Sequence, residues 1–181
     1  MNKRFSTKQL TLTALFLALC VVFQCFKGTS PVAPYLTGSA VNCILVVATL
    51  YCSLWSGTCI AILTPVIAYF IGATPIVNML PIMLPVIMIG NECLVLCAGL
   101  LKKKHLILGL SIGCITKSAF LWLTVWFAVL PLFGSKLPGQ VVLTAKTMFS
   151  VLQLVAACIG SIIAWAIYKK GLKRYEDFSN C

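Results

Sequence analysis

Acidic residues and histidine are scarce in this chain. Its 181 residues include three Asp and Glu residues, against 14 Lys and Arg residues, and a single histidine. Only 9% of the residues are charged, 61% are hydrophobic, and the mean hydropathy is +1.05. Soluble domains do not have such a composition. The chain is therefore predicted to be an all-α integral membrane protein, with residues 1–181 forming one transmembrane domain.

Sequence motifs for catalysis and metal binding are missing as well. There is no G-x-x-x-x-G-K-[ST], no H-E-x-x-H and no G-x-S-x-G. The ten cysteines lie mostly in apolar segments without a C-x-x-C pair, and His105 stands beside a lysine run. We therefore expect no enzyme activity, no metal and no other cofactor, and we interpret the cysteines as small apolar residues.

Six apolar runs predict a six-helix transmembrane bundle. The predicted spans are residues 10–26, 37–51, 55–70, 81–101, 106–130 and 141–168. Most approach the ~20 apolar residues that cross about 30 Å of hydrocarbon. On one side of the bundle the connections are residues 27–36, 71–80 and 131–140, which contain proline and are predicted to be loops.

Basic residues fall mainly on the other side of this arrangement, together with both termini. That side collects Lys3, Arg4, Lys8, Lys102, Lys103, Lys104, Lys169, Lys170, Lys173 and Arg174, and only Lys27 and Lys136 lie opposite. The positive-inside rule then predicts a multi-pass protein of the plasma membrane with cytoplasmic termini. Orientation and anionic lipid of the bilayer thus explain the net charge of +11, and no nucleic acid is expected.

Charged side chains inside the spans indicate a functional site. Glu92, next to Asn91, lies near the middle of the fourth span, where an ionised carboxylate is costly. At a rise of ~1.5 Å per residue, Lys117 of the fifth span reaches a similar depth, so the two side chains can pair. Such a pair is either part of a binding site or a structural link between helices.

Polar residues on the sixth span extend this candidate site. Lys146, Ser150 and Gln153 occur at i, i+4 and i+7, on one face of a helix. The candidate ligand-binding residues are Asn42, Asn91, Glu92, Lys117, Lys146, Ser150 and Gln153. We expect them to form a pocket for a small polar solute that opens to the outside. The surplus of lysine over glutamate favours a ligand with an anionic group.

Ala14 and Ala18 form a small-x-x-x-small pair on the first span, which lets another helix approach closely. This pair follows a short basic tail in a six-span chain, and residues 37–50 (TGSAVNCILVVATL) and 87–96 (IMIGNECLVL) add to the pattern. Over nearly its whole length the chain resembles the substrate-binding (S) component of an energy-coupling factor (ECF) vitamin transporter. Its second and fourth spans are similar to those of the riboflavin/folate/pantothenate-like branch.

The resemblance implies a subunit that captures a vitamin or related micronutrient outside the cell. In this family the A-x-x-x-A motif, here Ala14 and Ala18, docks on a transmembrane coupling subunit, and two cytoplasmic ATPases power the release of solute inward. No motif in the sequence selects the vitamin. Two other interpretations stay open at this point: a stand-alone secondary carrier or channel with a Glu92–Lys117 relay, and a membrane enzyme or structural assembly protein.

Overall fold

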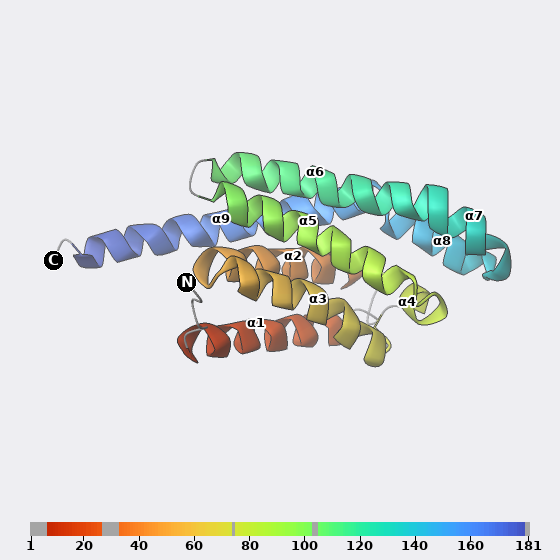
Figure 1. Ribbon diagram of the computed structural model, residues 1–181, viewed down its shortest axis with the longest axis horizontal. Helices are drawn as coiled ribbons and strands as arrows, with labels where there is room; N and C mark the ends of the chain where they lie inside the picture. Colours follow the sequence, from red (N-terminus) through yellow and green to blue (C-terminus); the bar gives the residue numbers. More distant parts are fainter. Residues whose placement is uncertain (1–6, 27–32, 74, 103–104, 180–181) are drawn as a thin grey trace.

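Long helices that run side by side along one axis make up most of the structure (Figure 1). The computed structural model describes residues 7–26, 33–73, 75–102 and 105–179, which form helices and no strand. The long helices are α1 (Thr7–Cys25), α2 (Ala33–Tyr51), α3 (Leu54–Phe70), α5 (Met83–Leu101), α6 (Leu106–Thr124) and α9 (Val151–Ser179). The predicted all-α architecture is confirmed.

Short helical elements gather at one end of the bundle, which we call the α8 end (Figure 1). They are α4 (Pro75–Met79), the π-helical turn η1 (Val125–Val129), α7 (Leu130–Phe133), the 3-10 turn η2 (Gly134–Lys136) and α8 (Gly139–Met148). α6, η1 and α7 form one continuous segment, Leu106–Phe133. The opposite end, where Lys102 follows α5, is called the Lys102 end.

The prediction of a simple bundle of six membrane-spanning helices needs correction. Within the described ranges, four helical segments are long and apolar enough to cross a membrane: Thr7–Cys25, Met83–Leu101, Leu106–Phe133 and Val151–Gly171. Tyr35–Tyr51 and Leu54–Phe70 are shorter apolar helices. The predicted loops 71–80 and 131–140 contain α4, α7 and η2, whereas much of the loop at 27–36 lies outside the described residues.

The predicted sixth span, residues 141–168, is two helices rather than one. α8 ends at Met148 and α9 begins at Val151, with Phe149 in a non-helical conformation (φ −102°, ψ 29°). Two local contacts account for the break. The Ser150 hydroxyl donates to the carbonyl of Thr147 at 2.7 Å, a side-chain bond that competes with helix continuation. The Phe149 side chain is 5% exposed, because the break turns it into an apolar cluster with α5 and α6.

α2 is the central helix of the bundle. All residues from Asn42 to Leu50 are buried, and α2 contacts α1, α3, α5 and α9. A helix that is apolar on nearly all sides can be buried in this way by neighbours on every side. At its crossing with α9, a Cβ atom on Gly160 would lie 2.5 Å from the Ser39 carbonyl oxygen and 2.8 Å from Asn42 Cβ, so the two helices meet at glycine.

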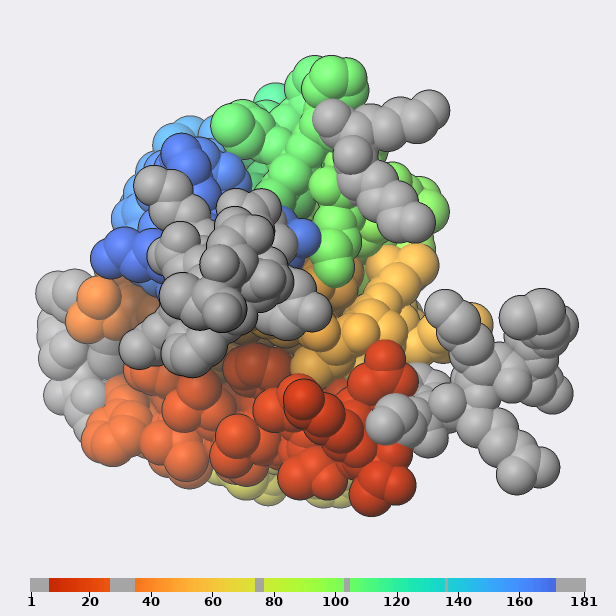
Figure 2. Space-filling model, turned by 90° about the vertical axis from the view of Figure 1, so that its left-hand side faces the viewer, coloured from red at the N-terminus to blue at the C-terminus, as the bar shows by residue number. Residues whose placement is uncertain are grey.

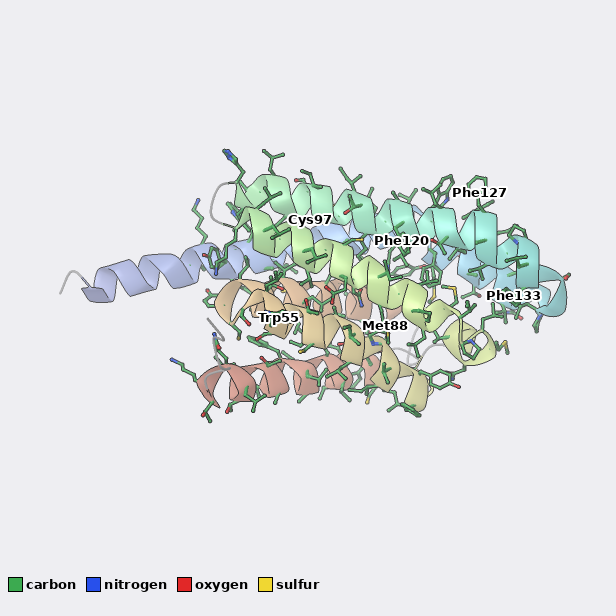
Figure 3. The ribbon with its side chains drawn as sticks, viewed as in Figure 1. Trp55, Met88, Cys97, Phe120, Phe127 and Phe133 are labelled. Atoms are coloured by element: carbon green, nitrogen blue, oxygen red, sulfur yellow. The ribbon has the colours of Figure 1, made fainter. Side chains whose placement is uncertain are left out.

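Apolar side chains cover the outside of the bundle. Trp55 is 69% exposed and Phe127 is 71% exposed, and Figure 3 shows them towards opposite ends of the molecule. In the end view of Figure 2, α1 lies along one edge of the bundle, and α6 and α9 lie on the other side. Exposed apolar surface of this extent is expected where lipid is the solvent.

Aromatic and basic side chains fasten the Lys102 end. The Tyr51 hydroxyl donates to the carbonyl of Ile167 at 3.0 Å, and the Tyr51 and Tyr168 rings meet edge to face with centroids 5.6 Å apart. The Lys102 ammonium group donates to the carbonyl of Leu50 and lies 5.5 Å from the Tyr168 ring centroid. α2, α5 and α9 are thereby joined at this end.

Candidate functional site

A cavity of ≈ 120 Å³ opens between the helices in the half of the bundle nearer the α8 end. Its polar lining consists of Gln24, Tyr35, Thr37, Asn42, Thr64, Asn91, Lys117 and Gln153. Its apolar lining consists of Gly38, Val41, Pro65, Ala68, Val77, Ile87, Met148, Phe149, Leu152 and Ala156. The lining thus comes from α1, α2, α3, α4, α5, α6, α8 and α9, and from the break at Phe149.

A buried lysine and two asparagines occupy the floor of this cavity. Lys117 is 2% exposed, and its Nζ donates to Asn42 Oδ1 at 2.5 Å and to Asn91 Oδ1 at 2.7 Å. Asn91 is held in turn, since its Nδ2 donates to the carbonyl of Ala61 at 3.3 Å. The group connects α2, α3, α5 and α6, and each amide presents its oxygen to the cation.

These three residues lie at one level in the bundle. Asn42 and Asn91 precede the last residues of α2 and α5 by nine and ten positions, and Lys117 follows the first residue of α6 by 11. At ~1.5 Å per residue, all three lie roughly 14–17 Å from the helix ends at the Lys102 end. The polar floor is therefore close to the middle of the membrane-spanning part.

Below the floor, the bundle is closed by apolar side chains. Val46, Leu94 and Cys114 lie three or four residues from the floor residues towards the Lys102 end, and all three are buried. They belong to a cluster, here called the lower cluster, of Cys43, Val46, Val47, Leu50, Leu94, Ala98, Leu110, Cys114, Ala157 and Ala164. The polar floor of the cavity therefore rests on a packed layer of apolar side chains.

The wall of the cavity next to α1 contains polar groups that were not among the predicted site residues. Gln24 is 5% exposed and its Nε2 donates to the carbonyl of Thr64 at 3.1 Å. The buried Thr64 hydroxyl has no hydrogen-bond partner among the described residues, although the Cys20 thiol lies close by. Gln24 carries the only side-chain amide in the apolar run 10–26, and this position could have indicated a buried polar site from the sequence.

The comparison with known families agrees with this architecture. A protein-family model described as "ECF transporter, substrate-specific component" matches residues 8–172. The chain belongs to this family. No curated protein and no solved structure matches it. It is accordingly a membrane protein and the substrate-binding subunit of an ECF importer, a class whose members bind small molecules and work with coupling and ATPase subunits.

Four of the seven predicted ligand-binding residues of the S component lie around the cavity. They are Asn42, Asn91, Lys117 and Gln153. These residues come from four different helices, and the fold brings them into one lining. Their role in solute binding stays a prediction, but their position is the one that such a role requires.

Glu92 does not pair with Lys117. Its Oε2 accepts a hydrogen bond from the Thr58 hydroxyl at 3.1 Å, and its Oε1 has no partner among the described residues. Adjacent helix residues point about 100° apart at 3.6 residues per turn, so Asn91 faces the cavity while Glu92 faces α3. The expected contact is therefore wrong, and a Glu92–Lys117 relay loses its geometric basis.

Lys146 and Ser150 are not among the residues that line the cavity. The Lys146 Nζ lies 5.3 Å from the ring centroid of Trp126, over the π-helical turn η1. Ser150 uses its hydroxyl to bond the carbonyl of Thr147, as described above. The predicted face of Lys146, Ser150 and Gln153 does not exist as one stripe, because the helix is broken between the first and last of these residues.

The predicted docking pair lies on an open helix face. Ala14 and Ala18 are both exposed, and in the described part of α1 only Cys20 and Gln24 are buried. Leu15 and Val22 extend the same apolar surface, at 63% and 52% exposed. This S component therefore presents a face with small side chains at its centre, suited to close helix contact.

Proposed function

We propose that this S component captures a vitamin-like micronutrient from outside the cell in the cavity above Lys117, and that it belongs to the riboflavin/folate/pantothenate-like branch. The observation that carries the proposal is the cavity itself, with polar groups of α2, α5 and α6 at its floor and the lower cluster beneath them. The lower cluster closes the cavity towards the Lys102 end, which favours entry of solute from the α8 end. Capture from one side and release elsewhere is what a binding subunit needs.

The proposed orientation places the α8 end outside and both termini in the cytoplasm. The positions of four described lysines support this orientation, because the helix ends that carry them lie towards the Lys102 end (Figure 1): Lys8, Lys102, Lys169 and Lys170. Of the described basic residues, the short elements at the α8 end contain Lys136 and Lys146. Lys3, Arg4, Lys27, Lys103 and Lys104 were part of the same prediction and lie outside the described residues.

In this proposal the chain hydrolyses no ATP, and two cytoplasmic ATPases drive release through a transmembrane coupling subunit. Ala14 and Ala18 form the docking surface for that subunit. The exposed face of α1 supports this role. Few side chains of α1 are buried within the chain, so most of its surface is available for contact with a helix of another subunit.

The test separates solute capture from transport. The purified chain is analysed by mass spectrometry for a co-purifying small molecule, and uptake of that molecule is measured in vesicles with the coupling subunit and ATPases. Ala14→Trp and Ala18→Trp should retain solute and abolish ATP-dependent uptake. Ile115→Trp is the matched control, because Ile115 is 60% exposed on α6, on the other side of the bundle from α1. Uptake that persists without ATP, or in both α1 variants, contradicts the proposal.

A further inference from the structure

We infer that the solute of this S component is an organic anion, and that Lys117 selects it by holding its acidic oxygen at the cavity floor. This inference rests on the proposed function and adds the chemical class of the substrate. It is carried by three observations on the described residues: the burial of Lys117, the neutrality of all its hydrogen-bond partners, and its place in the cavity lining.

The charge of Lys117 has no counter-charge in the cavity. Among the described lining residues none is acidic, and Lys117 is the only basic one. The chain has three acidic residues in total. Glu92 bonds to Thr58, while Glu176 and Asp177 follow the membrane-spanning part of α9, which extends past the bundle at the Lys102 end (Figure 1).

The two asparagines hold the ammonium group without neutralising it. An ammonium has three N–H donors, and Asn42 and Asn91 accept from two of them. The bond from Asn91 Nδ2 to the Ala61 carbonyl orients the amide so that its oxygen faces the ammonium group. One donor therefore remains for a molecule in the cavity. A buried cation with neutral partners is unfavourable, and a bound anion removes this penalty.

The rest of the lining describes the body of the solute. Val41, Ile87, Phe149 and Leu152 provide apolar surface between the floor and the α8 end, and Tyr35 and Gln153 add polar groups. A small carboxylate with an aromatic or aliphatic body matches this distribution, because its charged end meets Lys117 and its apolar part meets these side chains. A cationic solute would meet like charge at the floor.

The experiment compares acids with their amides. The purified full-length chain in detergent is titrated with nicotinate, 4-aminobenzoate and indole-3-acetate and with the three matching carboxamides, and binding is followed by thermal shift. In parallel, the molecule that co-purifies with the chain is identified by mass spectrometry. We expect the co-purifying molecule to be acidic, and at least one acid to bind at least about tenfold more tightly than its amide, as a charge-assisted hydrogen bond requires.

Two variants assign the effect to Lys117. Lys117→Met replaces lysine by an uncharged, unbranched side chain one atom shorter and should remove the preference for acid, while Lys117→Arg should retain part of it. Lys169→Met is the matched control, since this exposed lysine lies 5.0 Å from the Trp165 ring centroid at the Lys102 end. If Lys117→Met does not fold, the comparison of acids and amides on the unmodified chain decides alone.

The outcomes distinguish the inference from the proposed function. A neutral or cationic molecule that co-purifies and is taken up overturns the anion assignment and leaves the proposed function standing. Amides that bind as tightly as the acids overturn the anion assignment in the same way. A chain that binds none of the six compounds and carries no co-purifying molecule overturns both.

Discussion

The substitution Gly160→Ala should destabilise the protein, because the contact between α2 and α9 has no space for a methyl group. The added Cβ would lie 2.5 Å from the Ser39 carbonyl oxygen, 2.8 Å from Asn42 Cβ and 2.9 Å from the Cys43 nitrogen. These atoms belong to the backbone and to the base of a side chain of α2, so no rotamer change relieves the overlap. The helices must separate.

A matched variant calibrates the magnitude. Gly38 lies on the α2 side of the contact with α9, and a Cβ there would lie 3.6 Å from Ala156 Cβ, an ordinary contact. Gly38→Ala should therefore show only the gain in helix propensity, up to about 1 kcal/mol. Gly160→Ala has the same gain and loses about 1–3 kcal/mol through overpacking. The difference in unfolding free energy between the two variants should be about 1–3 kcal/mol.

Thermal unfolding in detergent measures this difference. For a chain of this size, 1 kcal/mol shifts Tm by about 2–4 °C, so Gly160→Ala should unfold about 2–12 °C below Gly38→Ala. Because the strain falls on Asn42, which holds Lys117, the Gly160 variant should also bind solute more weakly. Equal unfolding temperatures for the two variants would refute the close approach of α2 and α9.

Three further predictions concern single contacts. Asn91→Leu removes one acceptor from the buried Lys117 ammonium and should lower the unfolding free energy by about 1–3 kcal/mol. Adding Lys117→Met should recover part of this loss. Purely additive effects of the two substitutions in a double-mutant cycle would contradict the prediction. Tyr51→Phe removes the hydrogen bond to α9 at the Lys102 end and should cost about 0.5–1.5 kcal/mol in thermal unfolding, with unchanged solute affinity. Lys146→Ala removes the contact with Trp126 and should cost about 0.5–2 kcal/mol, and a large loss of solute affinity in this variant would show that Lys146 reaches the site after all.

The long helices could be predicted because bilayer depth demands apolar runs of a given length, and the runs 10–26, 81–101 and 106–130 correspond to α1, α5 and the α6 segment. The break at Phe149 could not. The apolar sequence from residue 141 onward has no proline and no glycine near the break. The break is caused by the burial of Phe149 and by the hydrogen bond from the Ser150 hydroxyl to the Thr147 carbonyl. Burial of a side chain depends on the tertiary structure, which the local sequence does not reveal.

The site was only partly predictable for a similar reason. Asn42, Asn91 and Lys117 stand out because polar groups are costly in a membrane. Which side of a helix faces inward is harder to predict, because α5 is apolar on nearly all sides and lipid-facing residues resemble core residues. Glu92 was therefore assigned the same direction as its neighbour. Gln24 and Thr64 were missed because no charged residue lies near either of them within α1 or α3.

The apolar layer beneath Lys117, Asn42 and Asn91 has a consequence for the membrane potential of the cell. Among the described residues, Val46, Leu94 and the other apolar side chains of the lower cluster pack between the cavity and the Lys102 end, which disfavours the passage of hydrated ions through the subunit. Many copies can then wait empty in the membrane without discharging its potential. In the proposed function, solute therefore leaves inward only when the whole subunit or its helices change position, and the coupling subunit and ATPases drive that change.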